Sequence, residues 1–230
     1  MTEEINNIEE EKSQIVKPSL FGMVMNPTEQ FQRLRENPKI LVAIIVVTIL
    51  TIIGTFMMLS GIDFLDQPEL AEFSEEEKMM VAMIGQISFV VVGAFVPIFS
   101  ILISTIVFII IAKIVKTDVT FKQLFSMNTY IFIIGTIGIL LNGIVFMLLG
   151  GEEGTMFTSL NSVVGAESFL GVFLESLEVF SIWSLIITAI GLQIVAKFSK
   201  GLSWAVVIGF YIVGLTFQMI SVGLSTMLGV

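Results

Sequence analysis

The sequence predicts an all-α, polytopic membrane protein: a bundle of five transmembrane helices with the N-terminus inside and the C-terminus outside. Composition indicates the class, because 55% of the residues are hydrophobic, only 13% are charged, and the mean hydropathy is +0.99. A soluble domain has roughly 25% charged residues. The segment 179–215 indicates the orientation, since it holds two apolar runs joined by a turn with Lys197, Lys200 and no acidic residue. Basic turns remain cytoplasmic.

The uncharged runs are long enough to cross a bilayer core of about 30 Å at 1.5 Å per helical residue. The second run covers 79–112 and exceeds that thickness, so its helix either begins among the outer headgroups or bends at Pro97. Of the 11 basic residues, only Lys78 falls in a predicted outer loop, which supports five crossings. The predicted spans are about 40–60, 84–112, 128–149, 178–197 and 203–226.

Two segments precede the predicted membrane domain, 40–230. Residues 1–17 are polar and acidic, and we predict a disordered cytoplasmic tail. The segment 18–39 is predicted to be amphipathic and to lie on the cytoplasmic leaflet, with a solvated linker as the alternative. Its helix is expected to start at Asn26 as N-cap, followed by Pro27, and to carry Phe31 and Leu34 on one side.

Two later helix starts also have recognisable signals. Ser74 with Glu77, and Thr120 with Gln123, have the spacing of capping boxes. The apolar residues between 169 and 177 recur at helical spacing, and we expect this segment to lie in the outer interface.

The chain lacks the residues on which several kinds of chemistry depend. The chain has no Cys and no His, which excludes disulfides, thiolate nucleophiles and histidine-based metal or acid–base sites. The net charge of −9 argues against binding nucleic acid. No predicted span has a charged residue near its centre, where pumps and proton relays carry them. We therefore expect no enzymatic activity, no catalytic residue and no cofactor or metal.

A few polar positions remain as candidates for function. Glu175 and Glu178 are three apart and are expected to share a helix face at the outer headgroups, with a proton or cation site as the alternative. Asn142 and Gln193 lie within spans, where hydrogen bonds between helices are the expected role and substrate contact the alternative.

Small residues four apart are expected to let helices pack closely. These pairs are Thr51/Thr55, Ser100/Ser104, Ser184/Thr188 and Ser221/Ser225.

The order of several short motifs resembles the Yip family of five-span membrane proteins. In the last hairpin these are Trp183, Gly191–Leu192, and Lys200 with Ala205 after the turn. The resemblance covers about 20–225. The other matching segments are 26–31 before Pro38, 99–102 and 119–124.

The resemblance implies five spans and a cytosolic N-terminus. Eukaryotic members are associated with prenylated small GTPases and vesicle traffic, but this sequence lacks their Asp-Leu-Tyr-Gly-Pro motif, so that role is not expected. Resemblance to bacterial members implies a plasma-membrane accessory protein beside an ABC-type exporter, with its permease/ATPase and adaptor subunits, in protection against a toxic peptide. A homo-oligomer is left open. The alternative is a small transporter or channel lined by Asn142, Gln193, Pro97 and the Glu175/Glu178 pair.

Overall fold

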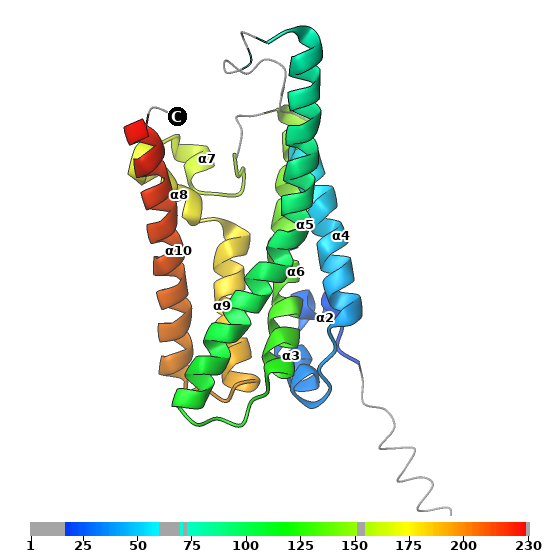
Figure 1. Ribbon diagram of the computed structural model, residues 1–230. Coiled ribbons are helices and arrows are strands. Elements are labelled where there is room, and N and C mark those ends of the chain that lie inside the picture. Colours follow the sequence, from blue (N-terminus) through cyan, green and yellow to red (C-terminus); the bar gives the residue numbers. More distant parts are fainter. Residues whose placement is uncertain (1–16, 60–69, 71–72, 151–154, 229–230) are drawn as a thin grey trace, which may run out of the picture.

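The computed structural model describes residues 17–59, 70, 73–150 and 155–228, and this part of the chain is helical without strands (Figure 1). The predicted tail, apart from Lys17, and most of the predicted loop after the first span lie outside the described residues. The helices are α2 (Leu20–Met25), α3 (Pro27–Glu36), α4 (Leu41–Leu59), α5 (Glu75–Ile114), α6 (Phe121–Leu149), α7 (Asn161–Val164), α8 (Ser168–Ser176), α9 (Val179–Ile194) and α10 (Lys200–Leu228).

Four helices in the described part of the chain are long and apolar enough to cross a membrane: α4, α5, α6 and α10. The apolar helix α9 has 16 residues and a length of roughly 24 Å, slightly less than a typical bilayer core. The all-helical membrane class is therefore confirmed, with four to five helices able to span. The fifth span and the orientation of the termini stay predictions.

Helix α6 is central, since it packs against α4, α5 and α9, while α10 packs against α9 and α8. Helices α5 and α10 approach each other at the lower end in Figure 1 and lie apart at the upper end. Their contact includes the rings of Phe108 and Phe210, whose centroids are 5.2 Å apart.

The predicted helix starts are confirmed. Asn26 is the N-cap of α3, and its side chain accepts a bond from the Glu29 N–H, with Pro27 in the first turn. Complete capping boxes begin α5, at Ser74 and Glu77, and also α6. Both boxes satisfy backbone donors that would otherwise lack partners at a helix start.

Helix α5 is continuous through Pro97 over its 40 residues, and it bends along its length in Figure 1. Proline has no N–H to donate to the preceding turn, which is a common cause of such a bend. The helix also begins at Glu75, nine residues before the predicted span 84–112. The helix therefore begins earlier than the predicted span and also bends, and its start among the outer headgroups stays a prediction.

The segment before α4 differs from the prediction. The side chains of Met23, Phe31 and Leu34 are fully buried, and α2 and α3 pack against the lower ends of α6 and α9. A Cβ on Gly191 would lie 3.0 Å from the Phe31 ring, so this glycine makes room for it. The apolar face expected on the lipid surface is instead covered by protein, because the ends of α6 and α9 present apolar side chains of their own. The exposed apolar residue Phe21 remains available to lipid.

Candidate functional site

Two of the candidate polar residues meet at the upper end of the bundle, around Thr158. The Asn142 amide donates to the Gly138 carbonyl and to the Thr158 hydroxyl, both at 2.8 Å, and accepts from the Thr158 N–H at 3.1 Å. The Thr158 hydroxyl donates to Glu178 at 2.6 Å. Asn142 therefore binds the segment before α7 and its own helix, rather than a neighbouring transmembrane helix as expected.

Glu178 is the N-cap of α9, and Glu175 lies in α8, so the expectation that they share one helix face is wrong. The helix that contains Glu175 ends at Ser176 with Leu177 as its C-cap, so Glu178 lies outside it. The two carboxyl groups nevertheless converge on the same segment, since Glu175 accepts from the Met156 N–H and the Ser159 hydroxyl, both at 3.0 Å. Both carboxyl groups thus hold this segment against the bundle. In the described residues no group of three or more acidic side chains is placed to hold a metal.

The other candidates take part in different interactions. The Gln193 amide donates to the Ala189 carbonyl of its own helix at 2.9 Å, so its recorded bond is not between helices. Trp183 is half-buried and packs near Phe180, with ring centroids 6.2 Å apart, and Pro97 is buried inside α5. The structure therefore brings Asn142, Glu175 and Glu178 together, and leaves Gln193, Trp183 and Pro97 separate.

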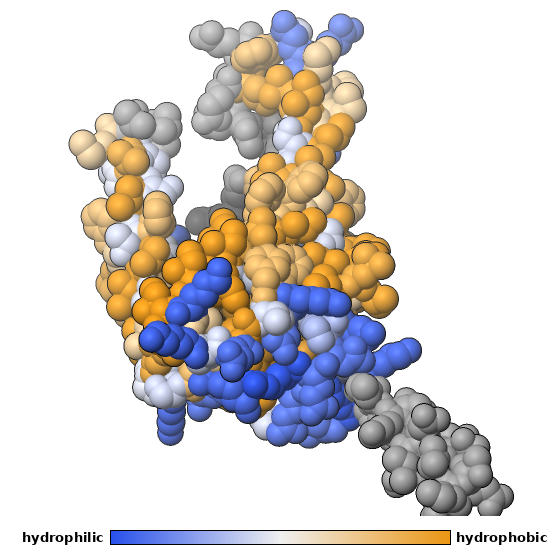
Figure 2. Space-filling view, turned by 60° about the horizontal axis from the view of Figure 1, so that its bottom comes forward, coloured by the Kyte–Doolittle hydropathy of each residue, from blue (hydrophilic) through white to orange (hydrophobic). Residues whose placement is uncertain are grey.

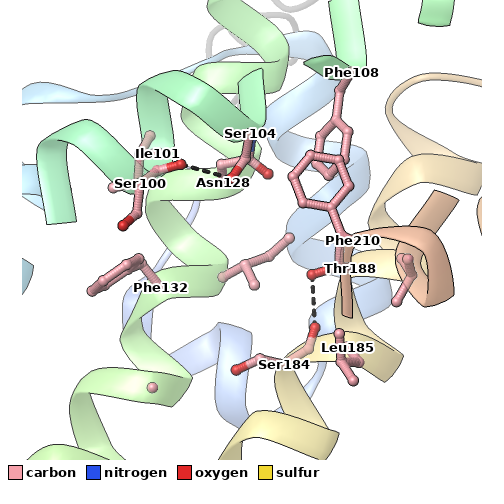
Figure 3. A pocket seen from close by; sticks show the side chains of 13 residues that line it. Ser100, Ile101, Ser104, Phe108, Asn128, Phe132, Ser184, Leu185, Thr188 and Phe210 are labelled. Atoms are coloured by element: carbon pink, nitrogen blue, oxygen red, sulfur yellow. Dashed lines mark hydrogen bonds between the residues drawn. The ribbon is translucent and has the colours of Figure 1, made fainter. Parts of the chain in front are cut away.

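A cavity of about 260 Å³ lies among α5, α6, α9 and α10 (Figure 3). Most of its walls are apolar, including Phe108, Leu185 and Phe210, and Gly135 forms part of the α6 wall. The remaining lining residues are Ser100, Ile101, Ser104, Asn128, Ile131, Phe132, Ser184, Thr188 and Val207. An apolar cavity with a few polar groups is a typical ligand site, and it is our candidate functional site.

Sequence reasoning did not find this cavity, although it found two pairs of its residues. Ser100/Ser104 and Ser184/Thr188 were expected to bring helices together, but they line the empty space between α5 and α9. Small side chains allow close packing only where a facing surface is present, and otherwise they leave room.

The polar side chains in these walls are mostly engaged with the protein. The Ser104 hydroxyl donates to the Ser100 carbonyl at 2.6 Å, and the Thr188 hydroxyl donates to the Ser184 carbonyl at 2.7 Å. The Asn128 amide donates to the Thr105 hydroxyl at 3.0 Å. The cavity therefore presents a surface suited to hydrocarbon more than to a hydrated solute.

A second cavity, of about 580 Å³, lies between α4 and α5. It contains a further small pair, Thr51 and Thr55, and the α5 glycines Gly85 and Gly93. The Thr51 hydroxyl donates to the Val47 carbonyl at 2.8 Å and lies 3.3 Å from the Thr136 hydroxyl. This hydroxyl therefore also has its hydrogen-bond partners within the protein.

Basic residues gather at the lower end of the bundle, where the segment before α4 and the α5–α6 and α9–α10 turns meet. Figure 2 shows this end as hydrophilic and the sides of the molecule as hydrophobic. The acidic residues of the described chain at this end are fewer: Glu29, Glu36 and Asp118. The basic residues are Lys17, Arg33, Arg35, Lys39, Lys113, Lys116, Lys122, Lys197 and Lys200.

Long apolar helices around a central α6, exposed apolar sides and one basic end define a multi-pass helical membrane protein. More particularly, the chain belongs to the Yip1 domain family, whose model matches residues 21–222. It is similar to the membrane protein YknW of Bacillus subtilis (strain 168), with 28% identity over 211 residues, which cover 89% of this chain and 90% of that protein. No solved structure matches. The family resemblance of the sequence motifs is thereby confirmed.

Proposed function

We propose that this protein is a non-enzymatic accessory protein of the cell membrane that assists the assembly or function of another membrane complex. Its N-terminus is cytoplasmic in this proposal, and all five apolar helices cross. The partner expected from the resemblance to bacterial family members is an ABC-type exporter with its adaptor subunit, in protection against a toxic peptide.

The observation that carries this proposal is the exposure of α10. In α6 the buried residues continue along most of the helix, but in α10 no residue from Ile208 to Met227 is buried. Helix α10 therefore offers nearly its whole outer part to its surroundings. Helices in membranes associate through such lateral surfaces, by close packing and occasional hydrogen bonds.

The test is purification of the tagged, full-length protein from its native membrane in detergent, with mass spectrometry of the proteins recovered. We expect stoichiometric recovery of exporter subunits. Replacing the exposed side chains Ile212, Val213 and Phe217 of α10 together by Ala should abolish that recovery.

A matched control is available on α4. Ile45, Ile49 and Ile53 are also apolar and about half exposed, and their triple replacement by Ala should leave the recovered subunits unchanged. If both triple variants lose the exporter subunits, or if neither does, α10 is not the contact surface. Absence of exporter subunits from the wild-type sample would overturn the exporter partner itself.

The transporter or channel alternative is less well supported by the geometry. Its predicted path used Asn142, Gln193, Pro97 and the Glu175/Glu178 pair. Asn142 and the two glutamates meet at the upper end, but Gln193 lies near the lower end and Pro97 inside α5. None of them lines either cavity described above. Flux of an ion or small solute through liposomes that contain only this protein would restore the alternative.

A further inference from the structure

We propose that the cavity among α5, α6, α9 and α10 holds one acyl chain of an anionic phospholipid, whose phosphate is bound by the lysines of the α5–α6 and α9–α10 turns. This site needs no exporter partner, and it is independent of the function proposed above. The size and depth of the cavity, the charge at its lower end and the backbone of the two turns support this occupant.

The size and lining of the cavity suit a hydrocarbon chain. An apolar cavity of roughly 150 Å³ can bind benzene, and this cavity has about 260 Å³. Several of its polar residues bond to the protein, so they make little demand for a hydrated ligand. At Gly135 an added Cβ would meet no atom within 4 Å, so the α6 wall leaves real space there.

The lower part of the cavity lies at the depth of the acyl region of one leaflet. Along α9, Thr188 lies roughly 9 Å from the lower end of the helix, and along α5, Ser100 lies roughly 21 Å from it. Half of a bilayer core is about 15 Å. A lipid with its headgroup at the basic end would therefore place its acyl chain at the level of this cavity.

Among the described residues, no ion pair involves the lysines of the α5–α6 and α9–α10 turns. These lysines, Lys113, Lys116, Lys197 and Lys200, are exposed. Figure 1 shows the lower ends of α5 and α10 near each other, so the α5–α6 and α9–α10 turns lie on the same side of the bundle. An anionic headgroup complements such a group of lysines electrostatically.

The backbone conformation distinguishes Lys116 and Lys197 from the other two lysines. Lys116 and Lys197 both have φ of 58°, and each follows the end of a helix. Glycine is the favoured residue at such a left-handed position because it has no Cβ. Lysine at both positions indicates that the side chains contribute something other than turn geometry. A cation is favoured at the carbonyl end of a helix, and its charge also suits phosphate binding.

The experiment is native mass spectrometry of the full-length protein in detergent, titrated with phosphatidylglycerol and, separately, with phosphatidylcholine of the same acyl chains. We expect one tightly bound phosphatidylglycerol, with a preference over phosphatidylcholine of about fivefold for each contributing lysine. Equal binding of the two lipids by the wild-type protein would overturn the proposal.

Two glycine variants test the cavity. Gly135→Leu should fill it and lower the affinity for both lipids by about tenfold or more. Gly209→Leu on α10 is the matched control, because an added Cβ there also meets no atom within 4 Å and the residue does not line the cavity. Unchanged affinity in Gly135→Leu, or equal losses in both variants, would refute binding in the cavity.

A double variant tests the headgroup site. Lys116→Gly with Lys197→Gly removes two charges and also relieves the backbone, so Tm should stay equal or rise while the preference for phosphatidylglycerol disappears. Retention of the full preference in this variant would refute the lysine assignment. A dimer that forms without lipid and is lost in Gly135→Leu would assign the cavity to a second copy of the chain instead.

Discussion

At the start of α9 the Glu178 side chain is only 6% exposed and accepts three hydrogen bonds. Two come from the backbone N–H groups of Phe180 and Ser181, at 3.0 and 2.6 Å, and one comes from the Thr158 hydroxyl at 2.6 Å. An acidic N-cap also interacts favourably with the helix dipole. Glu178 therefore joins the segment before α7 to the start of α9, and this is a structural role.

We expect Glu178→Gln to destabilise the protein by about 2 kcal/mol, or roughly 4–8 °C in Tm, because the amide can accept fewer of these bonds and carries no charge. Thermal unfolding in detergent measures the effect. Glu175→Gln is the matched control and should cost less, since Glu175 is less buried and accepts two bonds. Equal or reversed effects would contradict the role of Glu178 as the central acceptor.

Helices α4 and α6 pack closely because glycines face each other where they cross. A Cβ on Gly143 would lie 2.9 Å from the Gly54 carbonyl oxygen and 2.9 Å from the Met57 Cβ. A Cβ on Gly54 would in turn lie 2.8 Å from the Ile139 side chain. Such contacts between backbones are the usual basis of helix association in membranes.

Gly143→Ala should destabilise the protein by roughly 1–3 kcal/mol, because the new methyl group meets backbone that cannot move aside alone. Gly214→Ala is the comparison: an added Cβ there meets no atom within 4 Å, so a neutral effect or a small gain from helix propensity is expected. Denaturation in mixed detergent micelles reports both variants. If Gly143→Ala were as stable as Gly214→Ala, the close crossing of α4 and α6 would be incorrect.

At the scale of the whole molecule, the basic residues gather at one end of the helices. The α5–α6 and α9–α10 turns and the segment before α4 all lie at the lower end in Figure 1, and they carry the basic residues. The exposed residues Glu76, in the first turn of α5, and Glu167, the N-cap of α8, lie toward the opposite end of the bundle. Under the positive-inside rule, this separation supports the proposal of five crossings and a cytoplasmic N-terminus.

Because the chain contains no Cys, single cysteines can test this topology directly. In intact cells, a membrane-impermeant maleimide should label Glu76→Cys and Glu167→Cys, but label Lys122→Cys and Lys200→Cys only after permeabilisation. Labelling of Glu167→Cys and Lys200→Cys from the same side would mean that the 16-residue helix α9 does not cross. An internal pair on the same element, Lys200→Cys and Met227→Cys, should be labelled from opposite sides if α10 crosses.

The class of the protein, the apolar helices and the helix starts were predictable from the sequence. Length and hydropathy determine which segments can span a bilayer, and caps such as Ser74 with Glu77 depend only on residues three apart. These features involve neighbours in the chain, so a sequence contains all the information that they require. The positions of the basic turns along the chain were predictable for the same reason, because each turn comes directly after an apolar run.

Only the tertiary structure decided which apolar surfaces meet protein and which do not. Phe31 could face lipid or protein with the same sequence pattern, and it is buried against α9; Ser100 and Ser184 could have packed against a neighbour, and they line a cavity. In water the amphipathic period separates buried from exposed faces, but lipid and a protein interior are both apolar. A sequence of apolar helices therefore determines that they enter the membrane, and the fit between their surfaces determines where they touch.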